Sequence, residues 1–476
     1  MANENKNKIV LAVYILLSLV GIYTHEVWLD EAHHFLLARD SSTFVSMLQH
    51  CRYEGHPLLW NILLFGVTRI TANVMGMQLL HIVISTATVY LVLKSPLSFI
   101  EKLLIIFGYF MLYEYNVISR NYGICMLLLM AIITIYTHHK ERVISMAVLI
   151  FLMANTHLFG LALSGAFFIT YIIVERGGWM QISTSKRFGA VLIVLIGFAI
   201  SVCSIIPPVT YGQKFLSYEH SSSFSLDRIV KTLSPCLKGL VTTPNYLAYN
   251  TANRFIYTSL PGALQLLLSI LALVLPAVVF RKSKMAMILF YCFTMLYCAV
   301  YYFLPLTYGA RYFGFFYFAF IGCYWLCYSQ VSNFSKRLIL VVLSIQFVNG
   351  AYAYVKDILY PYSESKYVAK YLEQHALGKD VLILSPICRP GISAYTGKKY
   401  YDVATGKDES YSLWYMDISK DTIQQRVNKR LTEGSNFLII SNKPPENIPD
   451  SLLLKQQAVF DKGFMEGENV SIYSYK

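Results

Sequence analysis

The sequence predicts an α-helical polytopic membrane protein of about eleven spans, followed by a small C-terminal α/β extracytoplasmic domain. Apolar runs long enough to cross a bilayer recur through residues 1–359, whereas 360–476 has the composition of a soluble domain. Of the 476 residues, 56% are hydrophobic and 14% are charged, where a soluble chain has about a quarter charged residues. The net charge of +13 does not indicate a nucleic-acid partner, because the basic residues are dispersed between the apolar runs.

The apolar runs set the expected spans. A signal peptide is the alternative for the first run, but no small-residue cleavage site follows it, and we read it as a retained helix. The run at 57–70 is too short to span and suits a helix lying at the interface. The spans are expected at residues 9–24, 76–93, 102–118, 121–137, 143–156, 158–174, 188–206, 257–279, 285–303, 313–329 and 338–354.

The basic residues orient these spans. With the N-terminus in the cytoplasm, every internal connection is basic, as the positive-inside rule expects. Counting 57–70 as a span would put Arg281, Lys282 and Lys284 outside. We therefore expect a transmembrane module at 1–359 with outer loops 23–75 and 207–256, and an extracytoplasmic domain at 360–476. The expected location is a bacterial plasma (inner) membrane.

The first outer loop carries a pair of carboxylates directly after the first span. Asp30 and His34 are four residues apart and would share a helix face. A carboxylate at the mouth of an apolar cavity can act as a general base, which makes Asp30 and Glu31 catalytic candidates. The alternative is that Asp30 caps the helix while Glu31 favours its positive end. The spacing leaves both readings open.

Other polar residues are expected on the same outer side. Glu114, Arg120 and Tyr122 surround the turn between the third and fourth spans, and Arg311 and Tyr312 precede the tenth. Arginine matches phosphate oxygens bidentately, so these turns are candidates for binding a lipid phosphate. A simple ion pair between Glu114 and Arg120 is the alternative.

Arg52 and His56 stand just before the interfacial helix, where they would contact the anionic headgroup of a substrate or of bulk lipid. Zinc spacing is absent, so no metal site is assigned and no cofactor is certain, although a divalent cation stays an open option. One disulfide among the outward cysteines is likewise open. The histidines and carboxylate considered for a cation are His25, His33, His34, His56 and Asp30, and the outward cysteines are Cys51, Cys236 and Cys388.

The C-terminal domain shows helix–strand alternation. Amphipathic stretches at 365–375 and 422–431 predict helices, and the apolar runs 381–384 and 437–440 predict strands. This order predicts a small α/β layer with some parallel pairing. It contains no phosphate-cradling glycine motif, so we expect it to cover the outer cavity or to help hold an acceptor.

Several short motifs together resemble the GT-C superfamily, the polytopic glycosyltransferases that use polyprenyl-phosphate sugars. Protein O-mannosyltransferases and the aminoarabinose transferases of lipid A are the branches concerned. Two residues depart from the pattern that is common in this superfamily, namely Leu58, which follows His56-Pro57, and Gly123. The motifs are Leu29-Asp30-Glu31-Ala32 through Ala38-Arg39, His56-Pro57, Ser119-Arg120-Asn121-Tyr122, Arg311-Tyr312 and Tyr395-Thr396-Gly397-Lys398.

The resemblance implies a polyprenyl-phosphate-linked sugar donor whose tail lies among the spans, and a glycan, lipid or protein acceptor. The phosphodiester of the donor would lie near Arg120 and Arg311. Asp30 would deprotonate the acceptor hydroxyl, and the reaction would invert the configuration at the anomeric carbon. Two other functions use similar parts: a lipid-linked saccharide polymerase, and a transporter or flippase of such lipids. A transporter should show duplicated halves, and the sequence has no internal repeat.

Overall fold

The computed structural model describes residues 2–52, 54–206, 225–243, 260–304, 309–412, 419–433, 436–442, 454–465 and 467–475. Most of the predicted outer loop 207–256, the start of the span predicted at 257–279, and residues 305–308 before Arg311 lie outside these ranges. The chain forms two compact units. The first comprises 1–20, 55–60 and 81–355, and the second comprises 21–54, 61–80 and 356–476.

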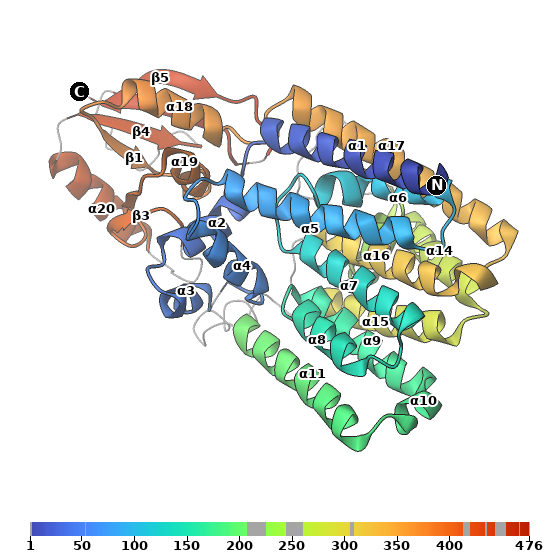
Figure 1. Cartoon of the computed structure of the whole chain (residues 1–476). Coiled ribbons are helices and arrows are strands. Elements are labelled where there is room, and N and C mark those ends of the chain that lie inside the picture. The colour runs from blue at the N-terminus through green and yellow to red at the C-terminus, as the bar shows by residue number, and fades with distance from the viewer. Residues whose placement is uncertain are drawn as a thin grey trace. The chain divides into compact units, whose positions relative to one another are not determined.

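The first unit is helical (Figure 1). A short π-helix, η1 (Tyr109–Glu114), and a 3₁₀ turn, η3 (Tyr328–Gln330), interrupt the α-helices. The helices that lie in this unit or run into it are α1 (Ala2–Thr24), α5 (Met75–Lys94), α6 (Phe99–Ile106), α7 (Tyr122–His138), α8 (Val143–Ala154), α9 (Leu158–Val174), α10 (Arg176–Gln181), α11 (Thr184–Ile205), α13 (Leu226–Leu240), α14 (Gly262–Phe280), α15 (Lys284–Phe303), α16 (Ala310–Cys327) and α17 (Asn333–Leu359).

Among the described residues, six helices are long and apolar enough to cross a membrane: α1, α5, α11, α14, α15 and α17. Helices α7, α8 and α9 are apolar but shorter. Such helices are those of an integral membrane protein. The predicted class is confirmed, while the number of eleven spans stays a prediction.

The run predicted as one span at 102–118 is broken. Helix α6 ends at Ile106, and η1 begins at Tyr109 after two intervening residues. At the break, a Cβ on Gly350 of α17 would lie 2.7 Å from the backbone of Gly108, so only a glycine permits this approach. Small residues at such crossings let membrane helices pack backbone to backbone. The close packing with α17 accounts for a break that hydropathy alone did not predict.

Helix α16 is the most enclosed helix of the first unit. Sixteen of its residues, most of them aromatic or small, are buried. It packs against η1, α7, α9, α13 and α15. A helix that is apolar all round is expected to be surrounded by other helices.

The second unit contains most of the first outer loop and the C-terminal sheet. The loop folds into α2 (Leu29–Asp40), α3 (Phe44–Cys51) and α4 (Leu59–Thr68), the last of which is the short helix predicted at 57–70. The other elements are α18 (Ser365–His375), β1 (Asp380–Ile383), α19 (Cys388–Thr396), β2 (Tyr400–Asp402), β3 (Lys407–Glu409), α20 (Lys420–Glu433), β4 (Phe437–Ser441), β5 (Leu454–Phe460) and β6 (Val470–Tyr475).

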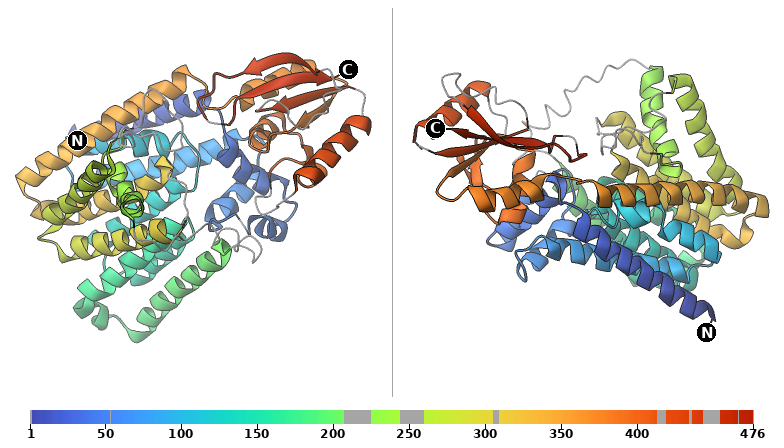
Figure 2. Two further views of the ribbon diagram at one scale, coloured as in Figure 1. Left: turned by 180° about the vertical axis from the view of Figure 1, so that it is seen from behind. Right: turned by 90° about the horizontal axis from the view of Figure 1, so that it is seen from above.

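The four-stranded sheet has the order β1-β4-β6-β5, and β2 pairs with β3 in a separate hairpin. Strands β1 and β4 are parallel, as predicted, while β6 is antiparallel to β4 and β5. Alternate residues of β4 face opposite sides: Leu438 and Ile440 pack with α18 and α19, and Phe437 and Ile439 pack with α20. The sheet is thus the middle layer of three, and Figure 2 shows it from two further sides.

The cysteines form no disulfide in the structure. All nine lie in described residues and are free, including Cys51, Cys236 and Cys388, which are buried. The Sγ atoms of Cys236 and Cys298 are 3.9 Å apart.

Candidate functional site

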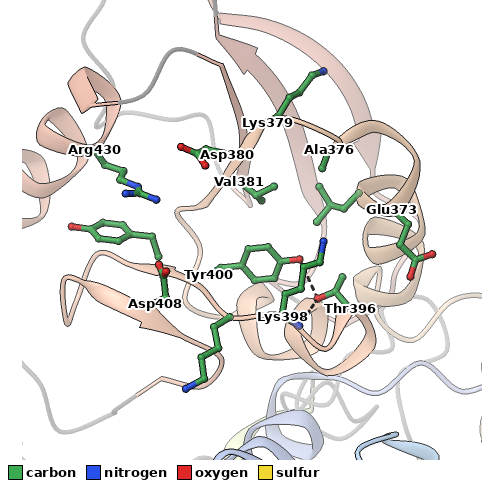
Figure 3. Close-up of a pocket in the computed structure, with 13 residues that line it drawn as sticks. Glu373, Ala376, Lys379, Asp380, Val381, Thr396, Lys398, Tyr400, Asp408 and Arg430 are labelled. Carbon is green, nitrogen blue, oxygen red and sulfur yellow. Dashed lines mark hydrogen bonds between the residues drawn. The ribbon is translucent and has the colours of Figure 1, made fainter.

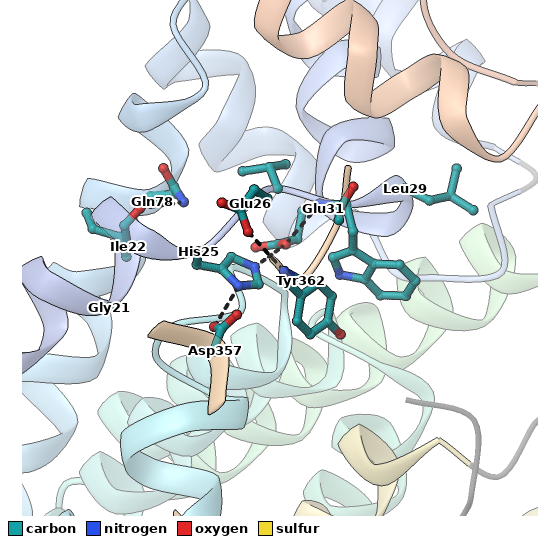
Figure 4. A network of polar contacts seen from close by, with 12 residues as sticks. Gly21, Ile22, His25, Glu26, Leu29, Glu31, Gln78, Asp357 and Tyr362 are labelled. Carbon is teal, nitrogen blue, oxygen red and sulfur yellow. Dashed lines mark hydrogen bonds and ion pairs between the residues drawn. The ribbon is translucent and has the colours of Figure 1, made fainter. Parts of the chain in front are cut away.

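A buried ionic network lies at the entrance to α2 (Figure 4). His25 contacts Asp357 through Nδ1 and Glu31 through Nε2, each at 2.9 Å. Burial opposes protonation of His25, but Asp357 and Glu31 together raise its pKa well above the usual value. His25 is therefore an imidazolium held between two carboxylates, and Oε2 of Glu31 also accepts from the N–H of Trp28 at 3.4 Å.

A second carboxylate reaches the first turn of α2 from the end of the chain. The backbone N–H of Leu29 donates to Glu468 Oε1 at 2.7 Å, and the Ser363 hydroxyl donates to the other oxygen. Burial raises the pKa of Glu468 to about 7, and the neighbouring Asp30 and Glu31 add to this effect. Asp30 itself is half-buried. The predicted base therefore lies on a helix start that distant residues hold in place.

The remaining predicted residues of this loop have separate partners. His34 Nδ1 lies 2.9 Å from Asn61 Oδ1. The neighbouring His33 bonds to Glu54 at 2.6 Å, and Arg52 is exposed. In the described part of the chain, no three His, Cys, Asp or Glu side chains gather in a group that could hold a metal ion. The first outer loop thus offers a ligand the carboxylate of Asp30 and several hydrogen-bonding side chains.

A cluster of cations and aromatic rings forms in the first unit from turns that are far apart in the sequence. The guanidinium carbon of Arg120 lies 5.8 Å from the centre of the Tyr122 ring, and that of Arg311 lies 5.5 Å from the Tyr312 ring. His157, in the turn between α8 and α9, lies between the two tyrosines, with centroids 5.4 Å from each. We call these five residues the arginine cluster.

His56, a predicted substrate-binding residue, lies beside the cluster, with its ring 5.3 Å from that of His157. Burial lowers the pKa of His157 well below the usual value, and His56, Arg120 and Arg311 repel its proton further. His157 is therefore a neutral imidazole that feels two permanent cations. An anion entering the cluster would meet two guanidinium groups and a ring nitrogen that can donate a hydrogen bond.

A hydrogen bond joins the turn of Arg120 to the turn of His157, and His81 contacts the Arg120 turn as well. Asn121 donates through Nδ2 to the Thr156 carbonyl at 2.6 Å, next to His157. The ring nitrogens of His81 lie 3.0 Å and 2.8 Å from the carbonyl oxygens of Asn116 and Arg120. A Cβ on Gly123 would lie 2.8 Å from the His81 ring, which explains why a glycine stands at this position.

Glu114 is the last residue of the π-helix η1 and is buried. It accepts a hydrogen bond from the Tyr109 hydroxyl at 2.8 Å. The adjacent Tyr115 donates its hydroxyl to the Arg311 carbonyl. Single-turn π-helices occur frequently at functional sites because they redirect side chains within a helix.

The predicted site residues thus form two groups. His56, Glu114, Arg120, Tyr122, Arg311 and Tyr312 lie in the first unit, and Asp30, Glu31, His34 and Arg52 lie in the second. Sequence reasoning missed His157, although the predicted topology places its turn on the outer side. It also missed Asp357 and Glu468, whose contacts with residues 25–31 leave no local sequence signal.

The described helices and the small α/β sheet have an ArnT-like fold, as the sequence resemblance to aminoarabinose transferases predicted. No protein-family model and no curated protein matches the chain. It is similar to ArnT from Cupriavidus metallidurans bound to undecaprenyl phosphate, with a TM-score of 0.54 and 11% identity, over 98% of this chain and 97% of that one. The apo state of ArnT gives a TM-score of 0.55 at 10% identity, over 100% and 98% of the two chains.

Proposed function

We propose that this chain is a membrane glycosyltransferase that moves a sugar from a polyprenyl-phosphate donor to an acceptor hydroxyl on the extracytoplasmic face. The arginine cluster carries this proposal, because it gathers two guanidinium groups on turns that are expected on the outer side. The fold adds support, since it is shared with a protein that was solved bound to undecaprenyl phosphate.

In the proposed reaction, Arg120 and Arg311 grip the phosphate oxygens of the donor. Each guanidinium can donate two parallel N–H bonds, which fixes the orientation of the phosphate. Negative charge grows on this phosphate as its bond to the anomeric carbon breaks, so preorganised cations stabilise the transition state more than the ground state. Tyr122, Tyr312 and His56 would shape the space around the phosphate, and Glu114 would hold the η1 turn beside it.

Asp30 is the proposed base. It takes the proton of the acceptor hydroxyl while the hydroxyl oxygen attacks the anomeric carbon from the face opposite the phosphate. The bond from the anomeric carbon to the phosphate oxygen breaks, and the polyprenyl phosphate leaves with the electron pair. The product has the inverted configuration. A phosphate leaves readily, so the acid that glycosidases need for their leaving group has less to do here.

The other loop residues support this base. Glu31, through His25, fixes the start of α2 and thereby positions Asp30. His34 and Arg52 are proposed to contact the acceptor, which is a glycan, a lipid or a protein. The N-terminus would be cytoplasmic and the 360–476 domain extracytoplasmic, in a bacterial plasma membrane whose lipids surround the spans.

The test is incubation of the purified protein with radiolabelled polyprenyl-phosphate sugars and a membrane extract, with identification of what becomes labelled. A glycosyltransferase gives a single sugar transferred to a new acceptor and free polyprenyl phosphate. A polymerase gives lipid-linked chains of increasing length, and a flippase moves the donor across liposomes without changing it. Either of the last two results would overturn the proposal.

A further inference from the structure

The second unit contains a polar cavity that the proposed transfer reaction does not use. It has a volume of about 310 Å³ and lies among the end of α18, the edge strand β1, the turn after α19, the β2–β3 hairpin and Arg430. This volume falls at the lower end of ligand pockets, which start at about 300 Å³. Figure 3 shows Lys398 and Arg430 entering the cavity from opposite sides.

The lining carries charges of both signs. Three lysines and one arginine stand against the carboxylates of Glu373, Asp380 and Asp408. Among the described residues these groups form no ion pair within 4.0 Å, although Lys399 also acts electrostatically on Asp40. Charges that share a hollow without pairing leave both donors and acceptors open to a ligand.

The chemistry of these groups selects the kind of ligand. Ammonium and guanidinium groups only donate hydrogen bonds, and carboxylates only accept them. A bare sulfate offers acceptors alone and inorganic phosphate offers few donors, so either would leave carboxylates of this lining without a donor. A polyhydroxylated molecule donates to the carboxylates, and an acidic substituent on it would accept from Lys398 and Arg430.

The aromatic residues argue against a nucleotide. Stacking a base requires an open ring face. Tyr400 is 6% exposed, and its hydroxyl donates to Thr396 at 3.0 Å. The ring of Tyr401 is covered by the Arg430 guanidinium, whose carbon lies 5.3 Å from the ring centre.

We propose that this cavity binds an anionic saccharide, with Lys398 and Arg430 on its acidic group and Asp408 and Asp380 on its hydroxyls. In an enzyme of the proposed function, this would be a part of the acceptor distant from the hydroxyl that reacts. That role rests on the proposed function, but the binding itself does not require transfer.

The experiment measures binding of N-acetylglucosamine 6-phosphate to the full-length, detergent-solubilised protein by titration calorimetry, without donor. N-acetylglucosamine and inorganic phosphate are the two comparison probes. The sugar phosphate should bind at least tenfold more tightly than either. Lys398→Glu and Arg430→Gln should each weaken it at least tenfold, and Asp408→Asn should reduce its advantage over inorganic phosphate.

Lys455→Glu is the matched control, because Lys455 is exposed on β5, at the opposite edge of the same sheet. It should leave binding unchanged, and melting temperatures should show that all variants are folded. Equal binding of phosphate and sugar phosphate, tighter binding of AMP, or no effect of the Lys398 and Arg430 variants would each overturn the proposal. Since no turnover is measured, these results are independent of whether the chain transfers a sugar.

Discussion

Asp30 is the residue on which the proposed chemistry depends most directly. Asp30→Asn should abolish transfer while leaving donor binding and melting temperature nearly unchanged, because the amide keeps the shape and loses the base. Positioned base catalysis contributes roughly 10²–10⁴-fold, so turnover should fall by at least 10²-fold in the radiolabel assay. Asp421→Asn, an exposed position in the first turn of α20, is the control. Activity above about a tenth of wild type would remove Asp30 as the base.

Lysine variants of the two arginines distinguish a role in donor binding from a role in the stability of the fold. Arg120→Lys and Arg311→Lys keep the charge but lose the fork that binds two oxygens. Losing a charge-assisted contact costs about 1.5–3 kcal/mol, so the KM for the donor should rise roughly 10- to 150-fold. Arg176→Lys, an exposed position on α10, should leave this KM unchanged. If both cluster variants melt earlier with normal donor kinetics, they serve the fold and not the donor.

Glu468 gives stability a predictable pH dependence. Its pKa is raised from 4.5 to about 7 by burial, so the folded state holds a proton that the unfolded state releases. The stabilisation it brings is complete below pH 4.5 and is lost as the pH rises through 7. At 1.36 kcal/mol per pKa unit, the loss is about 3 kcal/mol.

Glu468→Gln should therefore raise the melting temperature at pH 8 and not at pH 4.5, since the amide never ionises and still accepts from Leu29. Glu141→Gln, at an exposed position, is the control and should show no such difference. An equal shift of Glu468→Gln at both pH values would mean that the carboxyl is ionised throughout.

The turn between η1 and α7 is joined to the turn of His157 through the side chain of Asn121. Asn121→Ala removes the bond to the Thr156 carbonyl and leaves a buried acceptor unsatisfied, which costs about 1–3 kcal/mol. The melting temperature should fall and the donor KM should rise together, because Arg120 and His157 lose their tie. Thr137→Ala, at the other end of α7, should change neither. A stability loss without a kinetic change would show that the turn does not position the cluster.

Elements with a local pattern could be predicted, and those set by distant contacts could not. Helix α18 begins at Ser365 and ends at His375, as its amphipathic pattern predicted. Strands β1 and β4 pair in parallel, as expected. The break before η1 arises from the approach of Gly350 to Gly108, far apart in the sequence. His157 carries no motif of its own, and it became a site residue only through its neighbours in space.

For the whole molecule, the orientation in the membrane is the decisive prediction. Because every internal connection is basic, a C-terminal alkaline phosphatase fusion should be active and a C-terminal fluorescent protein dark. A phosphatase fusion at Lys336, in a connection predicted to be cytoplasmic, should be inactive. The reverse pattern would contradict the eleven-span topology and place the proposed chemistry inside the cell.

The C-terminal segments of the chain also determine when the sheet and the start of α2 can finish folding. Strand β6 joins β4 to β5, and Glu468 accepts from Leu29 across the whole length of the sequence. Pairings between distant segments form only after the later one exists. A nascent chain still held by the ribosome therefore has an unfinished sheet and an α2 without this partner. If Asp30 is the base, the protein has no transfer activity while it is being inserted into the membrane. It becomes active only after translation has passed residue 475.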